Sequence, residues 1–191
     1  MKPSTAQPDV EDVLARNAWF AGLTRSQKKV ELAREVIRYV ATQQISAKVI
    51  CYLDEDCYTI MRRHESNTLV MQQELQSRLQ RPDCMACAKG ALLLARMAGF
   101  NQVDGFEAGN RFHTGLGGIF TPEELEVIEV AFEGYPSNHR KIWDETVYDN
   151  ISRTERLVTI MQNIIDHKGR YVHPYRIAQP STKQENLDGG I

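Results

Sequence analysis

The sequence predicts a mostly α-helical protein, with a single compact helical domain over residues 1–170, a small β-hairpin within it, and a flexible tail over 171–191. Several segments place apolar residues three and four positions apart and are bounded by capping residues or prolines, which is typical of amphipathic helices. The length of 191 residues with 42% hydrophobic side chains suits one core better than two. A period of two occurs in only one short stretch, so we expect little β structure.

Two helices are predicted at the start of the chain. The first covers about 10–23 and has two acidic residues in its first turn, where the helix dipole favours them. The second covers about 24–43, because Thr24 and Gln27 have the spacing of a capping box and the segment has one apolar face. That face contains Val30, Ala33, Ile37 and Val40.

A β-hairpin is expected next. Apolar and polar residues alternate over 45–53, which indicates a half-buried strand. The acidic run 54–56 then provides a turn, and 57–61 provides a return strand.

Two further helices follow the hairpin. Ser66 or Asn67 caps the first, and Pro82 ends it. The second runs from Cys84 to about residue 98, with Asp83 as its cap and Gly99 at its end. It is apolar almost all round and carries a strip of small side chains, so we predict that it is the central core helix.

The C-terminal third begins with a glycine-rich loop over 101–120. Thr121 and Glu124 then have capping-box spacing, and a helix continues to a glycine at 134. A short helical piece is expected around 143–148. A last helix starts at the capping pair Ser152 and Glu155 and ends near residue 169.

Charge and the chain start narrow the function classes. A formal net charge of −2 lacks the basic excess of a general nucleic-acid binder, so a nucleic-acid partner is not expected. The first residues have no apolar signal segment, and the longest apolar run, 91–95, is too short to span a membrane. We therefore expect a cytoplasmic protein without a membrane segment, whose thiols stay reduced.

Four cysteines are the sharpest chemical feature. Cys51, Cys57, Cys84 and Cys87 could together bind zinc, but the first pair is spaced more widely than the usual zinc knuckle. A redox Cys-x-x-Cys lacks the expected βαβ surroundings, and Asp83 opposes a thiolate at Cys84. We favour buried structural thiols with no cofactor, and keep the zinc site as an alternative.

The glycine-rich loop is the candidate ligand site. Its predicted contacts are Arg111, His113, Gly117, Gly118 and Thr121, which could form an anion pocket before a helix N-terminus. No phosphate-loop motif is present, and two glutamates occupy that N-terminus, so a tight turn without a ligand is favoured. The same helix carries five glutamates, which form either a solvated face or a surface for a basic partner.

A family resemblance adds an expectation. The segment CMACAKGAL over 84–92, Phe100-Asn101, and the stretch from Phe120 to Glu133 resemble a group of small uncharacterised proteins of bacteria and their phages. Ala47-Lys48 and Tyr52-Leu53 belong to the same likeness, which spans about 28–133. The resemblance implies a compact accessory domain and brings no activity with it.

The expected function is therefore that of a non-enzymatic, cytosolic accessory or regulatory protein that binds a macromolecule, either a protein partner or a second copy of itself. No catalytic residues are assigned, since no nucleophile motif is present in the sequence. The two alternatives are a small-ligand or enzymatic pocket at the loop 101–120 and a zinc-stabilised interaction module.

Overall fold

The computed structural model describes residues 10–48, 52–101, 114–133, 148 and 150–173, and it is mostly helical, as predicted. In chain order the elements are α1 (Val10–Ala21), α2 (Arg25–Ala41), β1 (Ser46–Ala47), α3 (Glu55–Arg63), α4 (Thr68–Arg78), β2 (Met85–Ala86), α5 (Ala88–Leu94), the π-helical turn η1 (Ala95–Gly99), the 3-10 turn η2 (Thr114–Leu116), α6 (Pro122–Glu133) and α7 (Arg153–Asp166).

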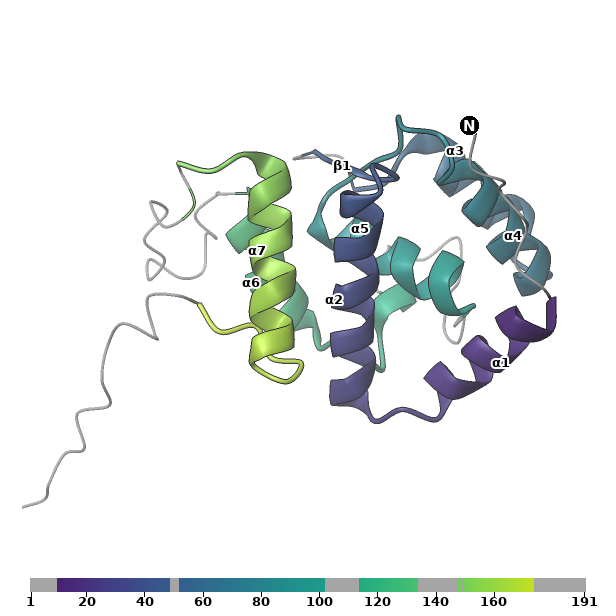
Figure 1. Ribbon diagram of the computed structural model, residues 1–191, viewed down its shortest axis with the longest axis horizontal. Helices are drawn as coiled ribbons and strands as arrows, with labels where there is room; N and C mark the ends of the chain where they lie inside the picture. The colour runs from purple at the N-terminus through teal and green to yellow at the C-terminus, as the bar shows by residue number, and fades with distance from the viewer. Residues whose placement is uncertain (1–9, 49–51, 102–113, 134–147, 149, 174–191) are drawn as a thin grey trace, which may run out of the picture.

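Helices α2 and α7 form the central pair of the fold. They run side by side in opposite directions, with α6 behind α7 and with α3 and α4 on the other side of α2 (Figure 1). The end of α7 lies against the start of α2, since a Cβ at Gly169 would be 2.6 Å from the backbone oxygen of Ser26. Gly169 has a φ of 92°, so this position excludes a side chain for two independent reasons.

Three helices begin at the capping boxes that the sequence predicts. Thr24 starts α2, Thr121 starts α6 and Ser152 starts α7. In α7 the Ser152 hydroxyl accepts from the Glu155 amide at 3.2 Å, and the Glu155 carboxylate accepts from the Ser152 amide at 2.8 Å. These reciprocal bonds satisfy amide groups that a helix start leaves without an intrahelical partner.

The segment α5–η1 is the central core element, as predicted. Every residue of α5 is buried, and so is every residue of η1. The helix starts at Ala88 and not at Cys84, because Met85 and Ala86 form a strand. Asp83 therefore does not cap it, and Cys87 occupies the N-cap position without a side-chain hydrogen bond.

The predicted β-hairpin is wrong. Strand β1 pairs in parallel with β2, so that Ser46 lies opposite Met85 and Ala47 opposite Ala86. Residues 57–61 belong to helix α3, whose N-cap is Asp54. The acidic run that suggested a turn instead provides the cap and first turn of a helix, a position that favours the same residue types.

Other predictions lie wholly or partly outside the described residues. The helical piece at 143–148 is described only at Tyr148, and the loop 101–120 only at its ends. Of the predicted tail only residues 171–173 are described, where the Val172 amide and carbonyl both bond the Asn163 side chain at 2.8 Å, so the tail stays a prediction. Within the described ranges, no helix is long and apolar enough to cross a membrane.

Candidate functional site

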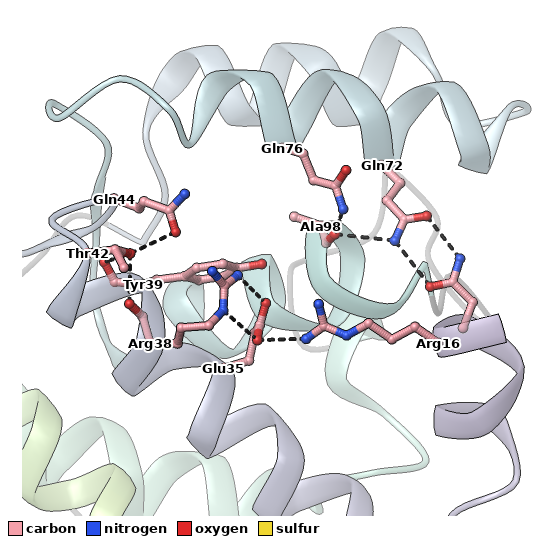
Figure 2. A network of polar contacts seen from close by, with 10 residues as sticks. Arg16, Glu35, Arg38, Tyr39, Thr42, Gln44, Gln72, Gln76 and Ala98 are labelled. Carbon is pink, nitrogen blue, oxygen red and sulfur yellow. Dashed lines mark hydrogen bonds and ion pairs between the residues drawn. The ribbon is translucent and has the colours of Figure 1, made fainter. Parts of the chain in front are cut away.

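A polar groove lies between α2 and α4, and α1 contributes to its wall. Its volume is about 380 Å³. Figure 2 shows side chains from all three helices converging beside it. The lining residues are Arg16, Glu35, Arg38, Tyr39, Gln44, Gln76, Leu79 and Gln80.

Glu35 is the centre of this groove. Its side chain is only 4% exposed, and two arginines converge on its carboxylate (Figure 2). Arg38, one turn later on α2, donates from Nη2 to Oε1 at 2.6 Å and from Nε to Oε2 at 3.0 Å. Arg16 of α1 donates from Nη2 to Oε2 at 2.8 Å. A bidentate pair and a third charge-assisted bond therefore fix both guanidinium groups.

Glu35 stays ionised in this setting. Burial opposes its charge, but the hydrogen bond from Arg38 and the charges of Arg16 and Arg38 outweigh burial and lower the pKa of Glu35. Hydrogen bonding to Glu35 raises the pKa of Arg38 in turn. One carboxylate and two guanidinium groups leave this cluster with a net charge of one positive unit.

Both guanidinium groups also rest on aromatic rings. The Cζ of Arg16 lies 4.7 Å from the centroid of Phe100, and the Cζ of Arg38 lies 4.7 Å from that of Tyr39. Cation–π contact and the bonds to Glu35 hold the two groups, while their side chains remain 43% and 49% exposed. The arginines are thus oriented by buried partners and still accessible from the groove.

The π-helical turn η1 contacts both α4 and α2 and supports the site. The Ala98 carbonyl lies in the last turn of this element, where a helix leaves carbonyl groups without an intrahelical donor, and Gln76 and Gln72 donate to it at 2.8 and 3.3 Å (Figure 2). Gly99 packs against Glu35, where a Cβ would lie 3.2 Å from Cγ and Oε1. Such turns are frequent at functional sites, and this one fixes both α4 and Glu35.

A buried amide pair ties α1 to this arrangement. Asn17 and Gln72 exchange two hydrogen bonds, of 3.0 Å from Asn17 Nδ2 and 3.2 Å from Gln72 Nε2. Phe20 of α1 stacks on Phe100 with the ring centroids 4.1 Å apart. These contacts set the position of Arg16, which lies on the same helix.

The groove has side chains that can bind an anion. Each guanidinium offers five N–H donors, and Glu35 engages only some of them. The planar guanidinium of arginine binds carboxylate or phosphate groups through two parallel N–H bonds. The glutamines at 44, 76 and 80 add amide groups that can donate or accept.

The predicted ligand residues of the glycine-rich loop are only partly described. Arg111 and His113 lie outside the described residues, so their role stays a prediction. The Thr121 hydroxyl accepts from the Glu124 amide at 3.2 Å and serves as a helix cap. Gly118 is exposed and has a φ of 76°, a backbone conformation that glycine adopts readily in tight turns.

Arg96 of η1 occupies the inner side of this loop. Its guanidinium is buried and donates to the carbonyl groups of Gly115 and Gly117. Those carbonyl oxygens thus point at a cation, whereas an anion pocket needs amide groups directed at the ligand. In the described residues the loop is organised around Arg96.

Three of the four cysteines are described, and all three are buried, as expected of structural thiols. The sulfur atoms of Cys57 and Cys84 lie 3.7 Å apart, and the Cys87 thiol donates to the Tyr52 carbonyl at 3.7 Å. The described ranges contain no cluster of three or more metal-ligating side chains. Cys51 lies outside them, so the four-cysteine zinc site is still only a prediction.

The acidic face of α6 is partly used for packing. Glu124 pairs with the buried Lys29 of α2, and Glu129 pairs with the buried Lys89 of α5 at 2.5 Å. Burial opposes the charge of Glu124, but the hydrogen bond from Lys29 helps to lower its pKa. Two of the five glutamates therefore anchor α6 to the core.

The sequence pattern does not single out Arg16, Glu35 or Arg38 as functional residues. Glu35 and Arg38 have the spacing of an ordinary ion pair on a helix surface, which gives no sign of burial. The side of the helix on which Glu35 lies is a better indication that Glu35 is buried, because Leu32, Val36 and Tyr39 on that side are all buried. The expected apolar face of this helix included Val30 and Ile37, which are only half-buried.

Comparison of the chain with models of protein families, with curated proteins and with solved structures found no match. Function is therefore inferred from the residues of the groove.

Proposed function

We propose that this chain is a cytoplasmic accessory protein, of a kind carried by bacteria and their phages, that acts by binding a protein partner. The groove between α2 and α4 is its recognition site, and it receives a carboxylate of the partner. The observation that carries this assignment is the pair Arg16 and Arg38, both half-exposed and both held by the buried Glu35.

Charge favours an acidic partner group. The cluster has a net positive charge and lies next to amide side chains that can bond a second oxygen. A carboxylate entering the groove would accept from N–H groups that Glu35 does not use. Charge-assisted bonds of this kind contribute about 1.5–3 kcal/mol each, enough for recognition of a short segment.

Helix α1 favours a protein as the source of that carboxylate. Within the described residues, the large hydrophobic side chains that are exposed all lie on this helix; they are Val10, Leu14 and Trp19. Trp19 is three residues from Arg16 and its ring lies 6.4 Å from that of Phe100. An acidic segment with apolar residues can therefore contact the groove and the outer side of α1 together.

The test is fluorescence anisotropy with two labelled peptides. One alternates glutamate and leucine, and the other has glutamine in place of each glutamate. We expect the acidic peptide to bind more tightly, with affinity that falls as salt is added. Equal affinity for the two peptides would contradict a carboxylate site.

A matched pair of variants locates the binding site. Arg16→Gln removes one groove guanidinium while Arg38 keeps Glu35 paired. We expect the affinity for the acidic peptide to fall about tenfold or more, equal to about 1.4 kcal/mol. The control is Arg34→Gln, because Arg34 is also on α2, is 58% exposed and pairs with Glu31 three residues before it. Arg34 lies outside the groove lining, so this variant should bind the acidic peptide as tightly as the unchanged protein.

A further inference from the structure

Cys57 and Cys84 form a thiol pair that the proposed binding function does not use. Their sulfur atoms are 3.7 Å apart, and both residues are fully buried. Cys57 lies in the first turn of α3, where its amide bonds the cap Asp54 at 3.4 Å. Cys84 directly precedes β2, and its carbonyl accepts from the Ser46 amide at 2.8 Å. The two cysteines therefore lie where α3 meets the small sheet of β1 and β2.

Arg78 of α4 is the cation beside this pair. Its buried guanidinium contacts three carboxylates that flank the cysteines: Asp54 at 3.0 Å, Asp56 at 3.3 Å and Asp83 at 2.9 Å. Asp83, which the sequence analysis expected to oppose a thiolate at Cys84, is thus paired with Arg78. The charge of Asp83 still opposes a thiolate at Cys84, as expected from the sequence, and the charge of Arg78 acts in the opposite direction.

The two thiols have different acidities. The hydrogen bond between the two thiols raises the pKa of Cys57, and burial adds to this increase. The same hydrogen bond and the charge of Arg78 lower the pKa of Cys84, against burial and the charges of Asp54 and Asp83. The charge of Arg78 therefore favours ionisation of Cys84 over ionisation of Cys57.

We propose that Cys57 and Cys84 are an oxidation site, which closes to an intramolecular disulfide when the protein meets hydrogen peroxide. The Cys84 sulfur attacks one peroxide oxygen, the O–O bond breaks, and the products are a sulfenic acid and, after protonation, water. The Cys57 sulfur then attacks the Cys84 sulfur, the S–O bond breaks, and a second water leaves with the Cys57 proton. Two thiols are oxidised and one peroxide is reduced to two waters.

The partner of Cys84 in this reaction is not the neighbour that the sequence motif suggests. Cys87 is buried, its thiol is directed at the Tyr52 carbonyl, and burial raises its pKa to about 11. The Cys57 sulfur already touches that of Cys84, so closing an S–S bond of about 2.05 Å needs a movement of less than about 2 Å. Because both sulfurs are buried, peroxide reacts when the first turn of α3 opens, and the reaction is slower than at an exposed thiol.

The test is disulfide mapping of the full chain after exposure to hydrogen peroxide, with remaining thiols alkylated before digestion. Tryptic peptide 49–62 contains Cys51 as well as Cys57, and peptide 79–89 contains Cys87 as well as Cys84. Cleavage before Asp54 and after Met85 separates the members of each pair. We expect Cys57 linked to Cys84 in the monomer. A link to Cys51 or Cys87, single-cysteine sulfinic acid without a disulfide, or no oxidation even in mild urea would overturn the proposal.

Variants provide the matched control. The double substitution Cys51→Ser and Cys87→Ser leaves only the proposed pair, and it should form the disulfide at the rate of the unchanged protein. Cys57→Ser should form no disulfide and should accumulate sulfenic acid at Cys84, detected with a dimedone probe. Zinc bound at one ion per chain and released by peroxide would overturn the proposal in favour of a metal site.

Discussion

Replacement of Gly90 by alanine should destabilise the fold strongly. A Cβ at this position would lie 1.5 Å from the Tyr52 carbonyl oxygen and 2.8 Å from its carbon. Real contacts of a Cβ are essentially never shorter than 3.0 Å, so α5 and the Tyr52 backbone would have to separate by about 1.5 Å. The obstacle is backbone and cannot rotate away.

The magnitude follows from two opposed effects. Overpacking of a rigid core costs about 1–3 kcal/mol or more, and this clash belongs at the upper end of that range. Alanine gains about 1 kcal/mol over glycine within a helix. We therefore expect Gly90→Ala to lower the free energy of unfolding by about 2 kcal/mol, a large part of the stability of a typical domain.

Urea unfolding followed by far-UV circular dichroism measures this loss, with Gly22→Ala as the control. A Cβ at Gly22 would have no neighbour nearer than 3.6 Å, so this variant should be neutral or stabilised by up to about 1 kcal/mol. If Gly90→Ala is as stable as Gly22→Ala, then α5 does not lie against the Tyr52 backbone, and the packing described for the core is refuted.

Three further outcomes are expected. The pKa values of Glu35 and Glu124 are lower in the folded protein than the ordinary value of 4.5. The stability that their ionised forms contribute is therefore complete above pH 4.5 and is lost as the pH falls through the lowered values. Urea unfolding between about pH 6 and pH 3 should show a smaller loss of unfolding free energy in Glu35→Gln than in the unchanged protein. Ser152→Ala removes the cap of α7 and should cost about 1 kcal/mol by the same assay, a loss that Ser152→Asp should largely avoid. Gly99→Ala presses on Glu35 at 3.2 Å and should weaken binding of the acidic peptide, so unchanged affinity would show that the position of Glu35 does not govern the groove.

Local chemistry made much of this fold predictable. The capping boxes at Thr24, Thr121 and Ser152 each predict a helix start, because the two reciprocal bonds involve residues only three positions apart. Burial of α5 was also predictable, since a segment that is apolar on all sides must lie inside. These features depend on neighbours in the sequence and need no knowledge of the tertiary fold.

Distant pairings were not predictable in the same way. Ser46 pairs with Met85 across α3 and α4, and a two-residue strand has too few side chains to show a period. The acidic run after Leu53 fits either a turn or a helix start, and only the position of Asp54 in the fold decides between them. Arg16 and Glu35 meet across the turn between α1 and α2, a geometry that no spacing within one helix encodes.

The antiparallel pairing of α2 with α7 affects how the chain folds during synthesis. Helix α2 is complete at Ala41, whereas the helix beside it begins at Arg153, more than a hundred positions later. While the ribosome adds those residues, the side of α2 that will face α7 has no native partner, and a chaperone that binds apolar helices can occupy it. Closure of the core is for this reason a late event, which cannot precede the synthesis of α7.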